Sequence, residues 1–85
     1  MEEFEFDGFV RARGPALAQA ALLLCGDTGR AEDLVQTGLL ALWTHGDGVP
    51  AAAWEAYTRR CIINAQSSWW RRRSAHERGR VRWSV

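Results

Sequence analysis

The strongest constraint on this chain is a helical repeat of apolar residues, which two glycine-rich segments divide into three stretches. In the first stretch, residues 3–24, apolar side chains recur mostly three or four positions apart: Phe6, Phe9, Val10, Leu17, Ala20, Ala21 and Leu24. This spacing puts them on one face of an α-helix. The segments GDTG (26–29) and THGDGVPA (44–51) interrupt the repeat, because glycine and proline favour turns.

The other two stretches have the same period. Residues 30–44 carry an apolar face made of Ala31, Leu34, Val35, Leu39, Leu42 and Trp43. Residues 52–73 carry an inward stripe made of Trp54, Tyr57, Cys61, Ala65 and either Ser68 or Trp69. Trp69 and Trp70 are about 100° apart on a helix, so they cannot both point inward; the helical stripe favours Trp69 but does not settle the choice.

Two residues are expected to shape these helices. Pro15 lacks a backbone donor, so we expect the first helix to kink or restart there. Gly38 costs the second helix roughly 1 kcal/mol relative to alanine through its low helix propensity. Its alternative role is to permit a close approach between two helices. With short connections and no strand-like alternation, the chain is predicted to be all-α, a compact three- to four-helix bundle.

The charge is distributed unevenly along the chain. Residues 1–56 carry nine acids and three arginines, net −6, whereas residues 57–85 carry eight arginines and one acid, net +7. Such asymmetry favours a nucleic-acid or acidic partner at the basic end. Residues 1–73 are expected to form one helical domain, and residues 74–85, which are basic and weakly patterned, a tail or linker.

Several classes of protein are disfavoured. The chain has no apolar run near the ~20 residues that a membrane helix needs. Its acidic start lacks the basic segment of a signal peptide, so we expect a cytoplasmic protein. Cys25 and Cys61 have no histidine or cysteine at metal-binding spacing, and His45 and His76 lack a catalytic constellation. We therefore predict no enzyme activity, no metal and no cofactor.

Three segments make the sequence more specific. AEDLVQTGLLALW (31–43) and AYTRRCIINAQSSWWRRR (56–73) resemble region 2 of the extracytoplasmic-function sigma factors of bacterial RNA polymerase. The opening FDGFVRARGPALAQAALLLCGD (6–27) is similar to the first helix of the actinobacterial members. The resemblance extends over roughly residues 4–74. It implies the helical fold of region 2 and a role in transcription initiation.

The resemblance implies that the DLVQ helix docks on core RNA polymerase, at the clamp coiled coil of the largest subunit. The corresponding face here would contain Asp33, Gln36, Thr37 and Leu40. An exposed leucine on a polar helix face also suits a protein contact. The family usually has glutamate where this chain has Thr37, so the clamp contact is expected to be weaker. The alternative from the residues alone is an ordinary solvated face.

The third helix resembles the part of the family that reads promoters. In the family, the asparagine that Asn64 matches and the preceding loop, here residues 44–51, hold a base flipped from the non-template strand of the minus-ten element. Asn64 shares a polar stripe with Arg60, Ser67 and Arg71. The arginines expected to bind phosphates are Arg59, Arg60, Arg71, Arg72 and Arg73. The alternative for the last three is a helix end stabilised by its dipole.

Two functions follow as hypotheses. The first is a sigma region 2 that docks on core polymerase and recognises and melts the minus-ten element. Family members also carry region 4, and the twelve residues after Arg73 are too few for it. The alternative is therefore an isolated interaction module that titrates an anti-sigma factor or the polymerase clamp without reading promoters. An anti-sigma factor is a further partner that the resemblance leaves open.

Overall fold

The computed structural model describes the backbone of residues 1–84 and the side chains of residues 1–76. Within these residues the chain forms three α-helices and no strand. They are α1 (Glu3–Cys25), α2 (Thr28–His45) and α3 (Trp54–Ser84), with a short 3-10 helix, η1 (Ala51–Ala53), before α3. The prediction of an all-α fold built from packed helices is confirmed.

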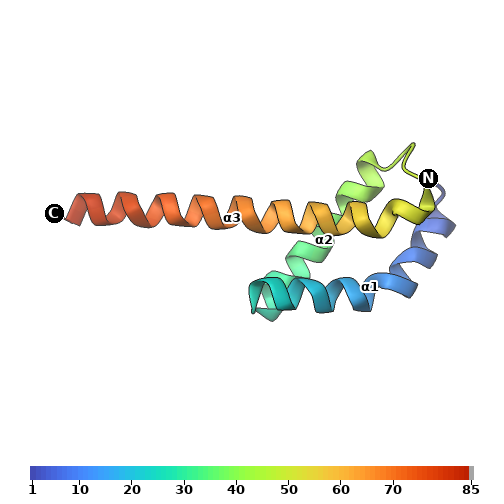
Figure 1. Ribbon diagram of the computed structural model, residues 1–85, viewed down its shortest axis with the longest axis horizontal. Helices are drawn as coiled ribbons and strands as arrows, with labels where there is room; N and C mark the ends of the chain where they lie inside the picture. Colours follow the sequence, from blue (N-terminus) through green and yellow to red (C-terminus); the bar gives the residue numbers. More distant parts are fainter. Residues whose placement is uncertain (85) are drawn as a thin grey trace.

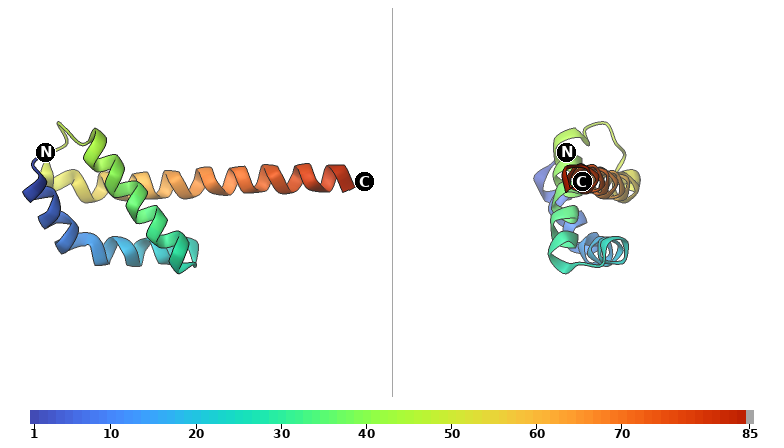
Figure 2. Two further views of the ribbon diagram at one scale, coloured as in Figure 1. Left: turned by 180° about the vertical axis from the view of Figure 1, so that it is seen from behind. Right: turned by 90° about the vertical axis from the view of Figure 1, so that its left-hand side faces the viewer.

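The helices are arranged around α2, which packs against both α1 and α3 (Figure 1). α1 and α3 contact each other less, and α2 crosses both of them obliquely (Figure 2). The second half of α3 projects past the other two helices (Figure 1). The molecule is 55 Å long, and the 31 residues of α3 alone span about 46 Å.

The first helix has the bend that its sequence predicts. Pro15 lies inside α1, and Figure 1 shows that the helix changes direction within its first half. The missing N–H of proline and its steric clash with the preceding turn account for the bend.

α1 ends at Gly26 in a left-handed conformation, with φ 72°. Asp27 then caps α2, because its carboxylate accepts a hydrogen bond of 2.8 Å from the Arg30 backbone N–H.

A small apolar core holds the three helices together. Leu17 and Ala21 from α1 meet Ala31 and Leu34 from α2 and Ile62 from α3.

Gly38 lies where α2 and α3 cross. A Cβ atom on Gly38 would approach Ile62 Cγ1 to 2.9 Å and the Thr58 carbonyl oxygen to 3.1 Å. The expectation that Gly38 permits a close approach between helices is therefore confirmed.

The inward stripe expected for the third helix was right at Trp54 and Ala65 and wrong at Tyr57 and Cys61. The buried stripe of α3 runs through Trp54, Thr58 and Ile62, whereas the predicted residues Tyr57 and Cys61 are only half-buried. The Thr58 hydroxyl donates a hydrogen bond of 2.8 Å to the Trp54 carbonyl oxygen, so its burial leaves no unpaired polar group.

The predicted end of the third helix at Arg73 is also wrong. The backbone of α3 continues to Ser84. Arginine, glutamate and alanine in this segment are good helix formers, and no proline interrupts them. The arginines at positions 78, 80 and 82 lie outside the residues whose side chains are described.

Candidate nucleic-acid interface

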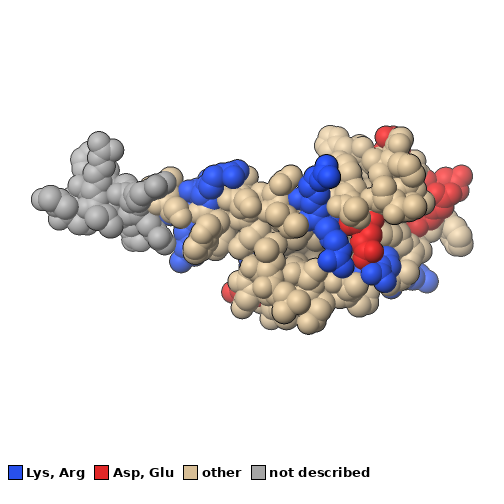
Figure 3. Space-filling model, in the orientation of Figure 1, with Lys and Arg blue, Asp and Glu red and all other residues tan. Residues whose placement is uncertain are grey.

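The basic surface of the molecule lies on α3, on the side that faces away from the core. Arg60, Asn64, Ser67 and Arg71 are exposed and follow one another at steps of four, three and four residues. They lie opposite the buried stripe that contains Thr58 and Ile62. Residues 56–76 include no aspartate or glutamate. Figure 3 shows arginines in separate groups along the molecule, with acidic residues at the end that holds the start of α1 and also between arginines near the middle.

The arginines of α3 differ in whether they already form ion pairs or hydrogen bonds within the protein. Arg59 contacts the Glu55 carboxylate at 3.5 Å, and Arg13 of α1 contacts the same oxygen at 2.6 Å. The hydrogen bond from Arg13 is the main cause that holds the pKa of the Glu55 carboxyl below its usual range. Glu55 therefore competes with a phosphate for Arg59.

The other arginines are less constrained by acids. Arg71 donates to the Ser68 hydroxyl at 3.3 Å, and the Arg73 guanidinium lies 5.4 Å from the centre of the Trp69 ring. Among the described side chains, Arg60 and Arg72 have no hydrogen bond or ion pair. Both are therefore available to an anionic ligand without breaking an existing contact.

Asn64 and the loop before α3 lie at different positions along the axis of α3. The loop is held by the Trp54 indole, which donates a hydrogen bond of 2.9 Å to the Val49 carbonyl oxygen, and it turns at Gly48, where φ is 90°. Asn64 lies ten residues into α3, about 15 Å along the helix axis from Trp54. A ligand that touches both would have to extend along the helix.

Sequence patterns gave no sign of the contact that braces the middle of α3. Arg30, in the first turn of α2, donates from Nε to the Gln66 side-chain oxygen at 3.3 Å. Its guanidinium also lies 4.8 Å from the centre of the half-buried Trp69 ring. Trp69 thus faces α2, while Trp70 is 58% exposed. The inward residue is therefore Trp69, the one that the helical stripe favoured.

A second exposed face lies on α2. Asp33, Gln36, Thr37 and Leu40 are all exposed, and Leu40 remains 64% accessible. Gln36 and Leu40 border a hollow of about 390 Å³, together with Leu39 and Trp43 of α2. The opposite wall of the hollow comes from α1 and consists of Glu3, Phe6 and Asp7.

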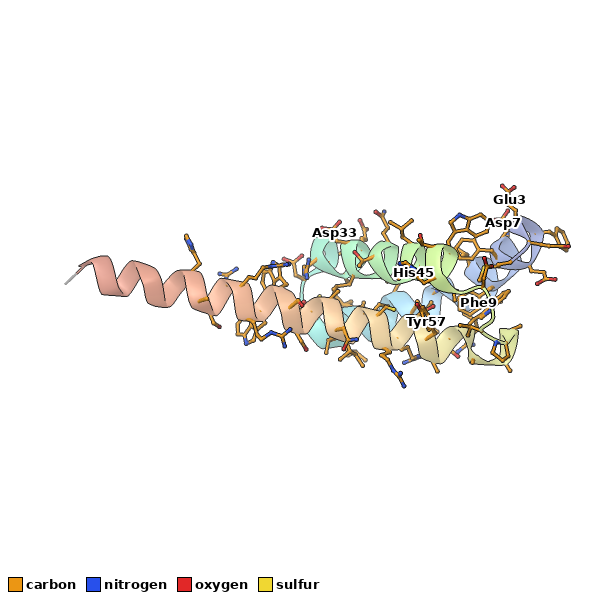
Figure 4. The ribbon with its side chains drawn as sticks, turned by 90° about the horizontal axis from the view of Figure 1, so that it is seen from above. Glu3, Asp7, Phe9, Asp33, His45 and Tyr57 are labelled. Atoms are coloured by element: carbon orange, nitrogen blue, oxygen red, sulfur yellow. The ribbon has the colours of Figure 1, made fainter. Side chains whose placement is uncertain are left out.

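The α1 wall was not predicted from the sequence. The Phe6 and Trp43 rings pack 5.0 Å apart and join the two helices at this point. Figure 4 places Glu3 and Asp7 at one end of this face and Asp33 toward the other. Asp33 and Thr37 share the exposed face of α2 but do not line the hollow.

Comparison with known proteins identifies this arrangement. Residues 9–76 match the Sigma-70 region 2 family. The chain belongs to this family. No solved structure shows a significant match. The part of the chain that carries the basic face of α3 and the exposed face of α2 is therefore a sigma region 2, as the sequence motifs indicated.

Curated relatives agree with this assignment. The chain is 39% identical over 77 residues to an RNA polymerase sigma-E factor of Streptomyces avermitilis, and it is 36% identical to proteins of the same name from Streptomyces coelicolor and Streptomyces antibioticus. Each match covers 89% of this chain and 43–44% of the relative. The chain thus spans less than half the length of these relatives.

Two further observations concern the described part of this sigma region 2. None of its helices combines the length and the apolar character that crossing a membrane requires. The side chains of residues 1–76 form no cluster of three or more histidine, cysteine, aspartate or glutamate residues that could hold a metal ion.

Proposed function

We propose that this chain acts in transcription initiation by docking on core RNA polymerase through α2 and binding the minus-ten element of a promoter through α3. The docking residues would be Asp33, Gln36, Thr37 and Leu40, against the clamp coiled coil of the largest subunit. The nucleic-acid residues would be Arg59, Arg60, Asn64, Ser67, Arg71, Arg72 and Arg73. The relatives named as RNA polymerase sigma factors support this proposal.

The observation that carries the proposal is the placement of the two faces. α2 meets α3 through Gly38, and Leu40 lies about 160° further round α2. α3 meets α2 through Thr58 and Ile62, and its polar stripe lies on the other side of that helix. The two faces thus point away from each other across the α2–α3 pair. A polymerase and a DNA strand could bind at the same time without competing for surface.

Each face has the chemistry that its partner requires. Arginine forms charge-assisted hydrogen bonds with phosphate oxygens, so Arg60 and Arg72 would fix the strand without reading its sequence. The Asn64 amide both donates and accepts, as recognition of the edge of an unpaired base requires. Capture of an unpaired base by Asn64, with the 44–51 loop contacting the strand further along the helix, would then favour melting without nucleotide hydrolysis.

The test is capture of core polymerase by the chain, followed by crosslinking of the complex to single-stranded DNA with and without a minus-ten sequence. Leu40→Asp should reduce capture strongly, whereas Leu23→Asp, a matched change on the exposed side of α1, should not. Asn64→Ala should reduce sequence preference. Unchanged preference in Asn64→Ala would show that the base-reading role is wrong.

The same experiment examines the alternative of a module that only titrates a protein partner. Such a module would capture polymerase or an anti-sigma factor and crosslink to no DNA sequence. The family match and the names of the relatives favour the sigma-factor proposal over this alternative.

A further inference from the structure

Beside the polar stripe of α3 runs a groove that neither the motifs nor the relatives assign to a function. It lies between the end of α1 and the middle of α3 and consists of two hollows that share Leu24. The first, of about 200 Å³, is lined by Ala20, Leu24, Arg59, Ile62 and Ile63. The second, of about 350 Å³, is lined by Leu24, Cys25, Gln66, Ser67 and Trp70. The wall on α3 extends about 16 Å, from Arg59 to Trp70.

Trp70 is the most prominent feature of this groove. More than half of its surface is exposed, so core packing does not explain a tryptophan here. Its ring is nevertheless held in place, because it stacks on Trp69 with centroids 5.9 Å apart and an angle of 25° between the planes. Trp69 is in turn fixed by Arg30 and Arg73. A large aromatic surface is thus held in one orientation and left open to solvent.

Polar groups lie next to this aromatic surface. The Gln66 side-chain oxygen accepts from Arg30, which turns the amide nitrogen and its two hydrogens away from that arginine. The Ser67 hydroxyl is exposed and makes no hydrogen bond within the described part of the chain. A planar ligand on Trp70 would therefore find both donors and an acceptor at its edge.

The charge around the groove favours a nucleic acid over a protein. Arg59 lies at one end of the groove, and Arg71 and Arg72 follow Trp70 at the other. Ser67 belongs both to the groove and to the polar stripe. A strand whose phosphates follow the stripe would therefore extend its bases over the groove. Positive charge beside an aromatic surface is the usual design of single-strand binding sites.

We propose that Trp70 is a stacking surface for an unpaired nucleobase of a single-stranded nucleic acid, with Gln66 and Ser67 contacting the edge of that base. This inference rests on the proposed nucleic-acid function of α3 but adds a second base site, distinct from Asn64. The two sites lie six residues apart on α3, about 9 Å along its axis. One strand could therefore occupy both.

The test measures binding of the full chain to short labelled single-stranded DNA by fluorescence anisotropy, alone and bound to core polymerase. Trp70→Ala should weaken binding roughly 5- to 150-fold, the range for loss of one base–aromatic stack. Trp70→Phe should retain most of the affinity, because phenylalanine keeps an aromatic face. Phe4→Ala, which removes an aromatic side chain that is 87% exposed at the start of α1, should bind DNA like the wild type.

Oligonucleotides with one abasic position identify the stacked base directly. For the wild type, one abasic position should weaken binding strongly; for Trp70→Ala the same position should matter little, because the stack is already lost. Two results would overturn the inference. The first is that Trp70→Ala binds as tightly as the wild type. The second is that Trp70→Ala binds more weakly, but every abasic position lowers its affinity by the same factor as it lowers that of the wild type. Loss of polymerase capture with intact DNA binding would instead identify the groove as a protein surface.

Failure of the inference can be told from failure of the proposed function. If the wild-type chain binds no single-stranded DNA, either alone or on polymerase, the proposed role of α3 fails and the Trp70 site with it. If the wild type binds and Asn64→Ala loses sequence preference while Trp70→Ala changes nothing, the proposed function stands and only the stacking site is wrong.

Discussion

The two halves of α3 differ sharply although they form one continuous helix. In the first half, Trp54, Thr58 and Ile62 are buried against the rest of the molecule. From Trp70 to His76, the side chains are exposed except for the half-buried Ser74. One half therefore packs against the rest of the molecule, and the other carries exposed arginines. Substitutions in the two halves should separate stability from binding.

The largest effect is expected from truncation of the packed half. Ile62 is 2% exposed and belongs to the core, whereas its neighbour Ile63 is 52% exposed. Ile62→Ala should lower the free energy of unfolding by about 2–5 kcal/mol, because it leaves a cavity. Ile63→Ala should change it by less than about 0.5 kcal/mol. Urea unfolding followed by circular dichroism measures both, and equal losses would contradict the division between the faces of α3.

The next largest effect is expected at the crossing of α2 and α3. Gly38→Ala should destabilise the fold by about 1–3 kcal/mol, because the added Cβ would meet α3 at about 3 Å. Gly8→Ala on α1 is the matched control, since no atom lies within 4 Å of its added Cβ. That change should stabilise the protein by up to about 1 kcal/mol through helix propensity. A stabilising Gly38→Ala would show that the two helices do not approach closely.

The third prediction concerns the projecting half. Arg72→Ala should leave the free energy of unfolding unchanged within about 0.5 kcal/mol, because the side chain is exposed. It should weaken DNA binding for all sequences alike and reduce the salt slope of the binding constant by about one. Titrations at several salt concentrations give that slope. Arg11→Ala, an exposed arginine on α1, should leave the slope unchanged.

The smallest effect is expected at the ion pair that joins the start of α3 to α1. Arg13 lowers the pKa of the Glu55 carboxyl, so the pair contributes stability above the ordinary carboxyl pKa. That contribution is lost as the pH falls through the lowered pKa. Glu55→Gln should therefore reduce the melting temperature slightly at neutral pH and not at acidic pH. A difference from the wild type that persists in acid would rule out ionisation as its cause.

The helices could be predicted from the sequence because their apolar period and glycine breaks are local signals. The exact inward face of α3 could not. Tyr57 and Cys61 look more apolar than Thr58, which is nevertheless buried because its hydroxyl bonds to the backbone. Leu24 matched the apolar stripe of α1 but is 44% exposed and lines the groove beside α3. Sequence spacing alone does not show how far a neighbouring helix extends.

The candidate site was predictable to a similar degree. The stripe from Arg60 to Arg71 follows from helical geometry, and all four of its residues are exposed. The brace from Arg30 to Gln66 and Trp69 joins residues more than thirty positions apart, so no local pattern indicates it. The α1 wall of the α2 hollow depends in the same way on how two helices cross.

The continuity of α3 has a consequence for how this region can change in evolution. Each residue of a helix turns the following ones by about 100°. A single insertion between Ile62 and Asn64 would therefore rotate Asn64, Ser67 and Arg71 away from their present face, while Thr58 stayed in the core. The turn at residues 46–50 has no such constraint. Length variation among relatives should accordingly collect in this turn, and the segment from Ile62 to Arg71 should keep its length.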